Sequence, residues 1–140
     1  ILSLLPLSLA TWRRQAVFAN SIALWQDTLA KSPTSDTAAN NLGFAFIRSG
    51  DHEAALEAFQ LALNLTKGRK PNALAGVAIA LESLNRPKEA EQYYQAAIAD
   101  NAKYGDPDGL VERMEVNLDD ADVLKQIQAR LPALQKNRTP

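Results

Sequence analysis

The sequence contains no cysteine, and His52 is its only histidine. Without cysteine, the 140-residue chain can form no disulfide, no thiolate metal site and no cysteine nucleophile. One histidine gives no basis for a Ser-His-acid arrangement. His52 lies between Asp51 and Glu53, where a helix is expected to start. An exposed residue at a helix end therefore explains it better than a metal ligand or a general base.

Glycine-rich motifs and charge of one sign are also lacking. Gly68, Gly76, Gly105 and Gly109 are isolated, and none belongs to a phosphate-binding loop. The net charge of −1 removes the electrostatic case for nucleic acid as a main partner. The acidic cluster Asp119-Asp120-x-Asp122 lacks the glycine and the spaced ligands of a calcium loop, so helix capping explains it better. We predict no metal, no cofactor and no catalytic residue.

A small basic loop is formed by Lys67, Arg69 and Lys70. Contact with phosphates or anionic lipid is one interpretation. Three charges of this kind more often form a solvated turn, which we favour.

The residues that are present favour a helical domain. Apolar residues make up 46% of the chain and charged residues 22%, a balance typical of one globular domain. Alanine and leucine dominate, and both favour helix. After the first 31 residues, three helix-breaking segments divide the chain: Ser32–Ser35, Lys67–Pro71 and Tyr104–Pro107.

The segment between the first two breakers predicts two helices joined by a short turn. Its helical periodicity is interrupted once, at Ser49-Gly50-Asp51. Gly50 suits the left-handed residue that ends a helix, and Asp51 suits the N-cap of the next one. The apolar stripes on the two helices are formed by Leu42, Phe46 and Ile47, and by Ala55, Leu56, Phe59, Ala62 and Leu63. So short a connection predicts an antiparallel hairpin.

The next segment repeats this plan. Pro71 opens a helix, Asn85-Arg86-Pro87 forms the turn, and Pro87 falls in the first turn of the following helix. Matching residues are 35 positions apart: Ala55 and Ala90, Phe59 and Tyr94, Ala62 and Ala97. A fixed period of this length with a helix-turn-helix unit indicates a solenoid.

The motifs in these segments resemble the tetratricopeptide repeat (TPR). Leu42-Gly43-x-x-Phe46, followed by Gly50, Ala55, Phe59 and Ala62, stands at the offsets of the TPR pattern. The second unit is looser, because Val77-Ala78-x-x-Leu81 replaces the first motif, while Ala90, Tyr94 and Ala97 fit. The resemblance covers residues 36–103. It implies an all-α fold, a right-handed superhelical stack of antiparallel helix pairs (a TPR-like α-solenoid), with small residues where paired helices approach closely.

The flanking residues are expected to cap the repeats. No breaker occurs from Trp12 to Lys31, which predicts one long helix with a covering face of Val17, Ile22, Trp25 and Leu29. Pro107–Asn117 and Asp119–Lys136 predict two further helices, the second with an apolar stripe of Leu124, Ile127, Leu131 and Leu134. We divide the chain into an apolar segment (1–10), an N-terminal capping helix (11–35), two repeats (36–70 and 71–103), and C-terminal capping helices with a tail (104–140).

The N-terminal third contains features that bear on whether the chain is associated with a membrane. Residues 1–10 are apolar and would form a helix of roughly 15 Å, about half a bilayer core. The end of a membrane helix and a helix packed on the repeats both fit this segment. Four motifs then follow in order: Thr11-x-Arg13-Arg14, Leu24-Trp25-Gln26-Asp27, Lys31-Ser32-Pro33 and Asn40-Asn41-Leu42-Gly43.

This order resembles the junction into the C-terminal TPR region of O-mannosyltransferase-like polytopic membrane proteins. That resemblance implies a membrane-associated chain whose repeats lie on the periplasmic or extracytoplasmic face, with membrane contact through residues 1–14. The positive-inside rule would instead place Arg13 and Arg14 in the cytoplasm. Both placements stay open.

The TPR resemblance implies a non-catalytic protein–protein interaction or scaffold module. In TPR stacks, the first helix of each pair lines a concave face where another protein or peptide binds. By offset, this groove is predicted to consist of Asn40, Phe44, Ile47, Arg48, Asn72, Ala75, Ile79 and Glu82. The alternative is that the flanking helices cover several of these residues.

Comparison of the groove with one TPR subclass excludes one kind of partner. Asn41 matches the asparagine of the carboxylate-clamp TPRs, but Thr37, Phe44, Asn72 and Gly76 stand where polar or basic residues would be needed. An acidic chaperone tail is therefore not expected. Two other functions stay open: an accessory TPR domain of a membrane glycosyltransferase-like protein, and a structural subunit of a larger membrane-associated complex.

Overall fold

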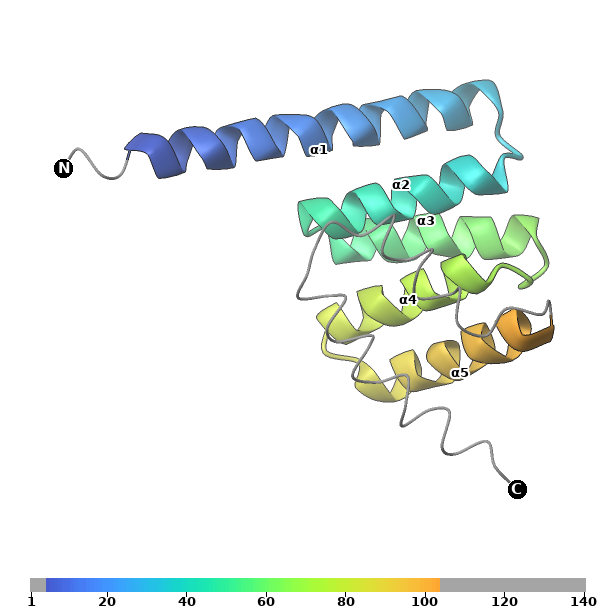
Figure 1. Cartoon of the computed structure of the whole chain (residues 1–140). Coiled ribbons are helices and arrows are strands. Elements are labelled where there is room, and N and C mark those ends of the chain that lie inside the picture. Colours follow the sequence, from blue (N-terminus) through green and yellow to red (C-terminus); the bar gives the residue numbers. More distant parts are fainter. Residues whose placement is uncertain (1–4, 104–140) are drawn as a thin grey trace.

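The computed structural model describes residues 5–103, which form five α-helices and no strand (Figure 1). The helices are α1 (Leu5–Lys31), α2 (Asp36–Ser49), α3 (His52–Leu65), α4 (Pro71–Ser83) and α5 (Pro87–Lys103). The prediction of an all-α stack of neighbouring helix pairs is confirmed. The two predicted C-terminal capping helices lie outside the described residues. In the described part, no helix combines the length and the apolar character needed to cross a membrane.

The turn between α2 and α3 forms as its sequence predicts. Gly50 adopts the left-handed conformation with φ 84°, and its N–H donates to the carbonyl of Ile47 at 3.1 Å. The side chain of Asp51 then caps α3 by accepting a hydrogen bond from the N–H of Ala54 at 3.1 Å. Ser35 caps α2 in the same way through Ala38. Each cap satisfies a backbone donor that the first helical turn leaves free.

The turn between α4 and α5 also ends a helix with a left-handed residue, but that residue is not glycine. Asn85 takes the left-handed conformation with φ 61°, which asparagine tolerates better than most residues. The N–H of Arg86 donates to the carbonyl of Leu81 at 2.8 Å and closes the end of α4. Pro71 and Pro87 are the first residues of α4 and α5, where a missing N–H costs no helical hydrogen bond.

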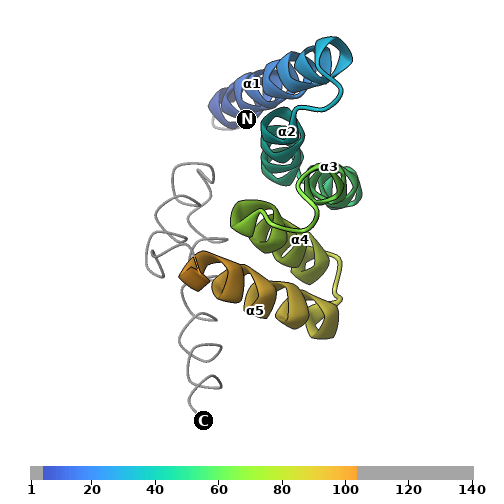
Figure 2. The ribbon, with the colours of Figure 1, turned by 90° about the vertical axis from the view of Figure 1, so that its right-hand side faces the viewer.

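The helices pack in a consecutive stack. α2 pairs with α3 and α4 with α5, while α3 also packs against α4 and α1 against α2. α2 and α4 touch each other as well, so α3 sits in the notch between them (Figure 2). The outer sides of α2 and α4, away from α3, therefore form one continuous surface. We call this surface the α2–α4 face.

The N-terminal helix differs from the prediction in its covering face. α1 is unbroken from Leu5 to Lys31 and so contains the long helix predicted from Trp12 to Lys31. Leu29 packs against the core as predicted, but Val17 is 61% exposed. The reason is direction, because Leu24, two helical turns from Val17 on the same side of α1, is also exposed, so this side faces solvent. α1 has 27 residues and α2 only 14, and α1 extends past the end of α2 (Figure 1).

The core is organised around the ring of Phe59, which is fully buried. A Cβ atom added to Gly43 of α2 would lie 2.6 Å from this ring, and one added to Gly76 of α4 would come closer still. The ring thus lies against the bare backbones of two helices at once. Phe44 completes the contact with an edge-on ring whose centroid is 4.9 Å from that of Phe59. The predicted need for a small residue at Gly43 is confirmed.

Replacing Phe59 by alanine is expected to destabilise the fold by about 3–5 kcal/mol, because it leaves a cavity between three helices. The measurement is chemical denaturation followed by circular dichroism at 222 nm. Leu61→Ala on the same helix is the matched control, since Leu61 is 39% exposed and should lose less than about 1 kcal/mol. Equal losses in the two variants would contradict the central role of Phe59.

Gly76→Ala should also destabilise the fold, by about 1–3 kcal/mol, because its Cβ overlaps the Phe59 ring. A loss of stability would be informative, because the same change from glycine to alanine in an open helix interior stabilises the fold by about 1 kcal/mol. In a Phe59→Leu background the smaller side chain should relieve part of the clash. A double-mutant cycle measures this relief, and purely additive effects would exclude the close approach.

Candidate functional site: the α2–α4 face

The eight residues predicted to line a groove belong to two neighbouring helices. α2 carries four of them and α4 the other four: Asn40, Phe44, Ile47 and Arg48, and Asn72, Ala75, Ile79 and Glu82. Because α2 and α4 touch, the fold brings these residues onto adjacent elements.

Most of these residues are covered. Five of them are at most 5% exposed: Asn40 (4%), Phe44 (1%), Ile47 (5%), Ala75 (1%) and Ile79 (3%). Arg48, Asn72 and Glu82 are half-buried. Phe44 is held inside the stack by its contact with Phe59, so its predicted role at an open surface does not follow from its position. Whether the face binds a partner stays a prediction.

Two matching stripes connect the face with the core. Thr37, Asn41, Phe44 and Arg48 follow each other at helical spacing along α2, and Asn72, Gly76, Ile79 and Ser83 do so along α4. Phe44 and Gly76 lie against the Phe59 ring of α3, so each stripe runs partly on the side that faces α3. Thr37 and Ser83, at opposite ends of their stripes, are exposed. Ser83 is not among the groove residues that the sequence predicts. Its position four residues after Ile79 is the signal that would have found it.

Two asparagines of the face have buried carbonyl oxygens that lack a hydrogen bond. They are Oδ1 of Asn40 on α2 and Oδ1 of Asn72 on α4, and neither has a partner among the residues the structure describes. Leaving a buried acceptor unpaired costs about 1–3 kcal/mol. Both oxygens are suited to accept hydrogen bonds from N–H groups.

The charged residues of the face are already engaged. The hydroxyl of Tyr94 donates to Oε2 of Glu82 at 3.1 Å, which ties α4 to α5. Glu82, Tyr94 and Arg48 each have further interactions, so none of them is free. The face consequently has an apolar centre, two amides and polar ends.

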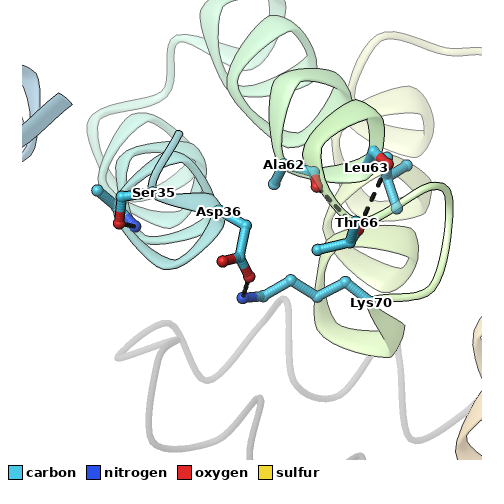
Figure 3. A network of polar contacts seen from close by, with 7 residues as sticks. Ser35, Asp36, Ala62, Leu63, Thr66 and Lys70 are labelled. Carbon is cyan, nitrogen blue, oxygen red and sulfur yellow. Dashed lines mark hydrogen bonds and ion pairs between the residues drawn. The ribbon is translucent and has the colours of Figure 1, made fainter. Parts of the chain in front are cut away.

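One residue of the predicted basic loop forms an ion pair that joins the two repeats. Nζ of Lys70 lies 2.5 Å from Oδ2 of Asp36, the first residue of α2 (Figure 3). The hydrogen bond from Lys70 lowers the pKa of the Asp36 carboxyl, and the nearby positive charge acts in the same direction. Thr66 closes the end of α3 by donating from Oγ1 to the carbonyl of Ala62 at 2.9 Å (Figure 3). Lys67 and Arg69 are exposed, as expected of a solvated turn.

A shallow hollow lies between α3, this loop and α5. It has a volume of about 540 Å³ and is lined by Gln60, Leu63, Asn64, Lys67, Gly68 and Tyr93. It is widely open to solvent and contains no cluster of titratable groups.

His52, the only histidine, is the first residue of α3, as predicted for a helix end. The predicted exposure is wrong, because the side chain is half-buried, and Nδ1 has no hydrogen-bond partner within residues 5–103. The same part of the chain holds no group of three or more histidines or carboxylates placed to bind a metal. The acidic cluster at Asp119–Asp122 lies outside it.

Comparison with known families agrees with the geometry of the first helix pair. Residues 37–68 match a family model described as a tetratricopeptide repeat. The match spans α2, α3 and the start of the loop that follows them. No curated protein matches the chain. Residues 37–68 are thus similar to a TPR unit, and the helix pair α4–α5 repeats the arrangement of α2–α3 35 residues later.

The pair between Lys70 and Asp36 predicts a pH-dependent contribution to stability. Because folding lowers the pKa of Asp36, the contribution is present above its ordinary pKa of about 3.9 and disappears as the pH falls through the lowered value. Lys70→Met should raise the pKa of Asp36 and reduce stability at pH 7 by about 0.2–1 kcal/mol, as expected for a partly exposed pair.

A carbon-detected NMR titration of the carboxyl groups measures the pKa, and urea denaturation at pH 7 and pH 3 measures the stability. The difference between Lys70→Met and the unchanged chain should be smaller at pH 3. Arg69→Met is the matched control, and an Asp36 pKa that responds equally to both variants would refute the specific pair.

Proposed function

We propose that the chain is a non-catalytic protein–protein interaction module that binds a segment of another protein on the α2–α4 face. The observation that carries the proposal is the TPR match over residues 37–68, which makes α2 the first helix of a repeat and its outer side the expected binding surface. α4 holds the equivalent position in the next pair, and its outer side continues the same surface.

The chemistry of the face supports an extended peptide as partner. The unpaired Oδ1 atoms of Asn40 and Asn72 can accept hydrogen bonds from main-chain N–H groups. Thr37 and Ser83 are exposed at the two ends of the face, where side chains of the same peptide can contact them. Recognition of this type takes its affinity from main-chain hydrogen bonds and its specificity from the side-chain pockets.

A catalytic role has less support. In the described part, Asp36 and Glu89 form ion pairs with Lys70 and Arg86, and Asp51 caps α3. Nδ1 of the half-buried His52 has no hydrogen-bond partner there. A binding module needs none of these groups for chemistry.

The membrane-tethered forms of this function stay predictions from the sequence. They rest on the apolar residues 1–10 and on the motif order that resembles the entry into the TPR region of O-mannosyltransferase-like proteins. An accessory domain of a membrane glycosyltransferase-like protein would use the same face to position its acceptor protein.

Asn72→Leu should weaken peptide binding by about tenfold, because it removes the acceptor oxygen while keeping a side chain of similar size. Asn72→Asp keeps an acceptor and should bind much more like the unchanged chain. The measurement is selection of linear peptides from a displayed random library against the full chain, followed by calorimetry of the selected peptide with each variant.

The matched control is Asn64→Leu, which changes an exposed asparagine of α3 away from the face. Selected peptides that are equally sensitive to Asn64→Leu, or indifferent to Asn72→Leu, would place the binding surface elsewhere. Failure to select any peptide would argue for the structural-subunit alternative.

A further inference from the structure

Two hollows lie beside the loop that joins α3 to α4. The first has a volume of about 540 Å³, and its lining comes from α3, the loop and α5. The second has a volume of about 380 Å³ and is lined by Gly68, Leu74, Ala96, Ala99 and Asp100. Gly68 lines both, so the two hollows adjoin at this residue. We call them together the α3–α5 groove. No residue of its lining belongs to the α2–α4 face.

The groove exists because small residues stand where side chains would otherwise fill it. Gly68 takes the left-handed conformation with φ 74°, and its N–H donates to the carbonyl of Leu63 at 2.7 Å. A Cβ atom added to Gly68 would have no neighbouring atom within 4 Å. On the α5 side of the groove, Ala96 and Ala99 are exposed. The groove thus stays open because the residues at its centre carry little or no side chain.

The α3 side of the first hollow carries two amides. Gln60 and Asn64 are four residues apart, so they lie on the same side of α3, and both are exposed. Each amide has donor and acceptor atoms, which match the C=O and N–H groups of a polypeptide main chain. Tyr93 of α5 is half-buried and adds an aromatic side chain with a polar end, a type that is enriched at protein interfaces. The lining therefore suits a segment of another protein.

The charge of the groove is divided between its two parts. Lys67 is the charged residue in the lining of the first hollow, and Asp100 is that of the second. Lys67 and the nearby Arg69 are exposed, and neither forms an ion pair within residues 5–103. An acidic side chain is therefore favoured over the first hollow and disfavoured over the second. Over the second hollow, the exposed methyl groups of Ala96 and Ala99 favour an apolar side chain.

A membrane surface fits these observations less well than a protein segment does. Basic clusters that bind anionic lipids contain about four to eight lysines or arginines. The loop supplies only Lys67 and Arg69, because Lys70 is bound to Asp36. The two amides of the first hollow also offer hydrogen bonds along a line that an extended main chain can follow.

We propose that the α3–α5 groove is a second binding surface, which takes a protein segment with an acidic side chain close to an apolar one. The acidic side chain pairs with Lys67, the main chain bonds to Gln60 and Asn64, and the apolar side chain lies over Ala96. The α2–α4 face takes no part, so the inference goes beyond the proposed function. A chain with two separate surfaces can hold two protein segments at once, as a scaffold does.

Counter-selection isolates ligands of this groove. Linear peptides from a displayed random library are selected on the full chain, and those that also bind Ala96→Trp are removed. Tryptophan at this exposed position fills the second hollow. The surviving peptides should share an aspartate or glutamate within a few positions of a leucine, isoleucine or phenylalanine. Gln95→Trp is the matched control, since Gln95 is an exposed residue of α5 outside the lining, and it should still bind the survivors.

Calorimetry of a surviving peptide then tests the charge. Lys67→Glu should weaken binding by about tenfold or more, and added salt should weaken binding to the unchanged chain. Arg69→Glu is the matched control, because it makes the same charge change in the same loop outside the lining. It should weaken binding by less than about threefold. Asn72→Leu should have no effect, so failure of this proposal and failure of the proposed function are distinguishable.

Three results would overturn the proposal: no surviving peptide, survivors without an acidic residue, or equal losses of affinity in Lys67→Glu and Arg69→Glu. A fourth is binding of phosphatidylserine vesicles that Lys67→Glu abolishes, since this result would assign the loop to a membrane.

A second measurement needs no variant and decides the case in which Ala96→Trp unfolds the chain. Amide chemical shifts are recorded while a peptide selected on the full chain is added. For an acidic peptide, the largest changes should fall on Gln60, Asn64 and Gly68. If no acidic peptide is selected, or if its largest changes fall on α2, the proposal is wrong.

Discussion

The contact of one aromatic ring with two glycines sets the spacing of the whole stack. Phe59 lies against Gly43 and Gly76, so α3 approaches α2 and α4 as closely as a ring between two bare backbones allows. This spacing brings α2 and α4 into contact with each other. The α2–α4 face exists because of that contact, since two separated helices would present two narrow stripes instead of one surface.

The same ring couples the face to the core. Phe44 belongs to the outer stripe of α2 by its spacing, but its ring packs edge-on against Phe59. A change in the packing of Phe59 would therefore shift a residue at the centre of the face. At the edge of the stack, the pair between Lys70 and Asp36 fixes the loop before α4 to the start of α2. Core contact and ion pair both hold the two repeats in one register.

The sequence predicts local features well because they depend on neighbouring residues. The turn at Gly50 and Asp51, the prolines that open α4 and α5, and the 35-residue period all appear as expected. Burial of the face could not be predicted in the same way. It depends on contacts between residues that are distant in the sequence, whereas periodicity gives only the direction in which a side chain points. The exposure of Val17 has another cause, since at about 100° per residue it points away from the direction shared by Ile22, Trp25 and Leu29.

The distribution of polar groups on the face favours an extended peptide over a helical one. A helical partner keeps its backbone hydrogen bonds internal, so it brings no free donor to the oxygens of Asn40 and Asn72. An extended peptide brings unpaired N–H groups. The difference amounts to about 1–3 kcal/mol for each oxygen satisfied. On this argument Asn40 and Asn72 are the residues that select the backbone conformation of the partner.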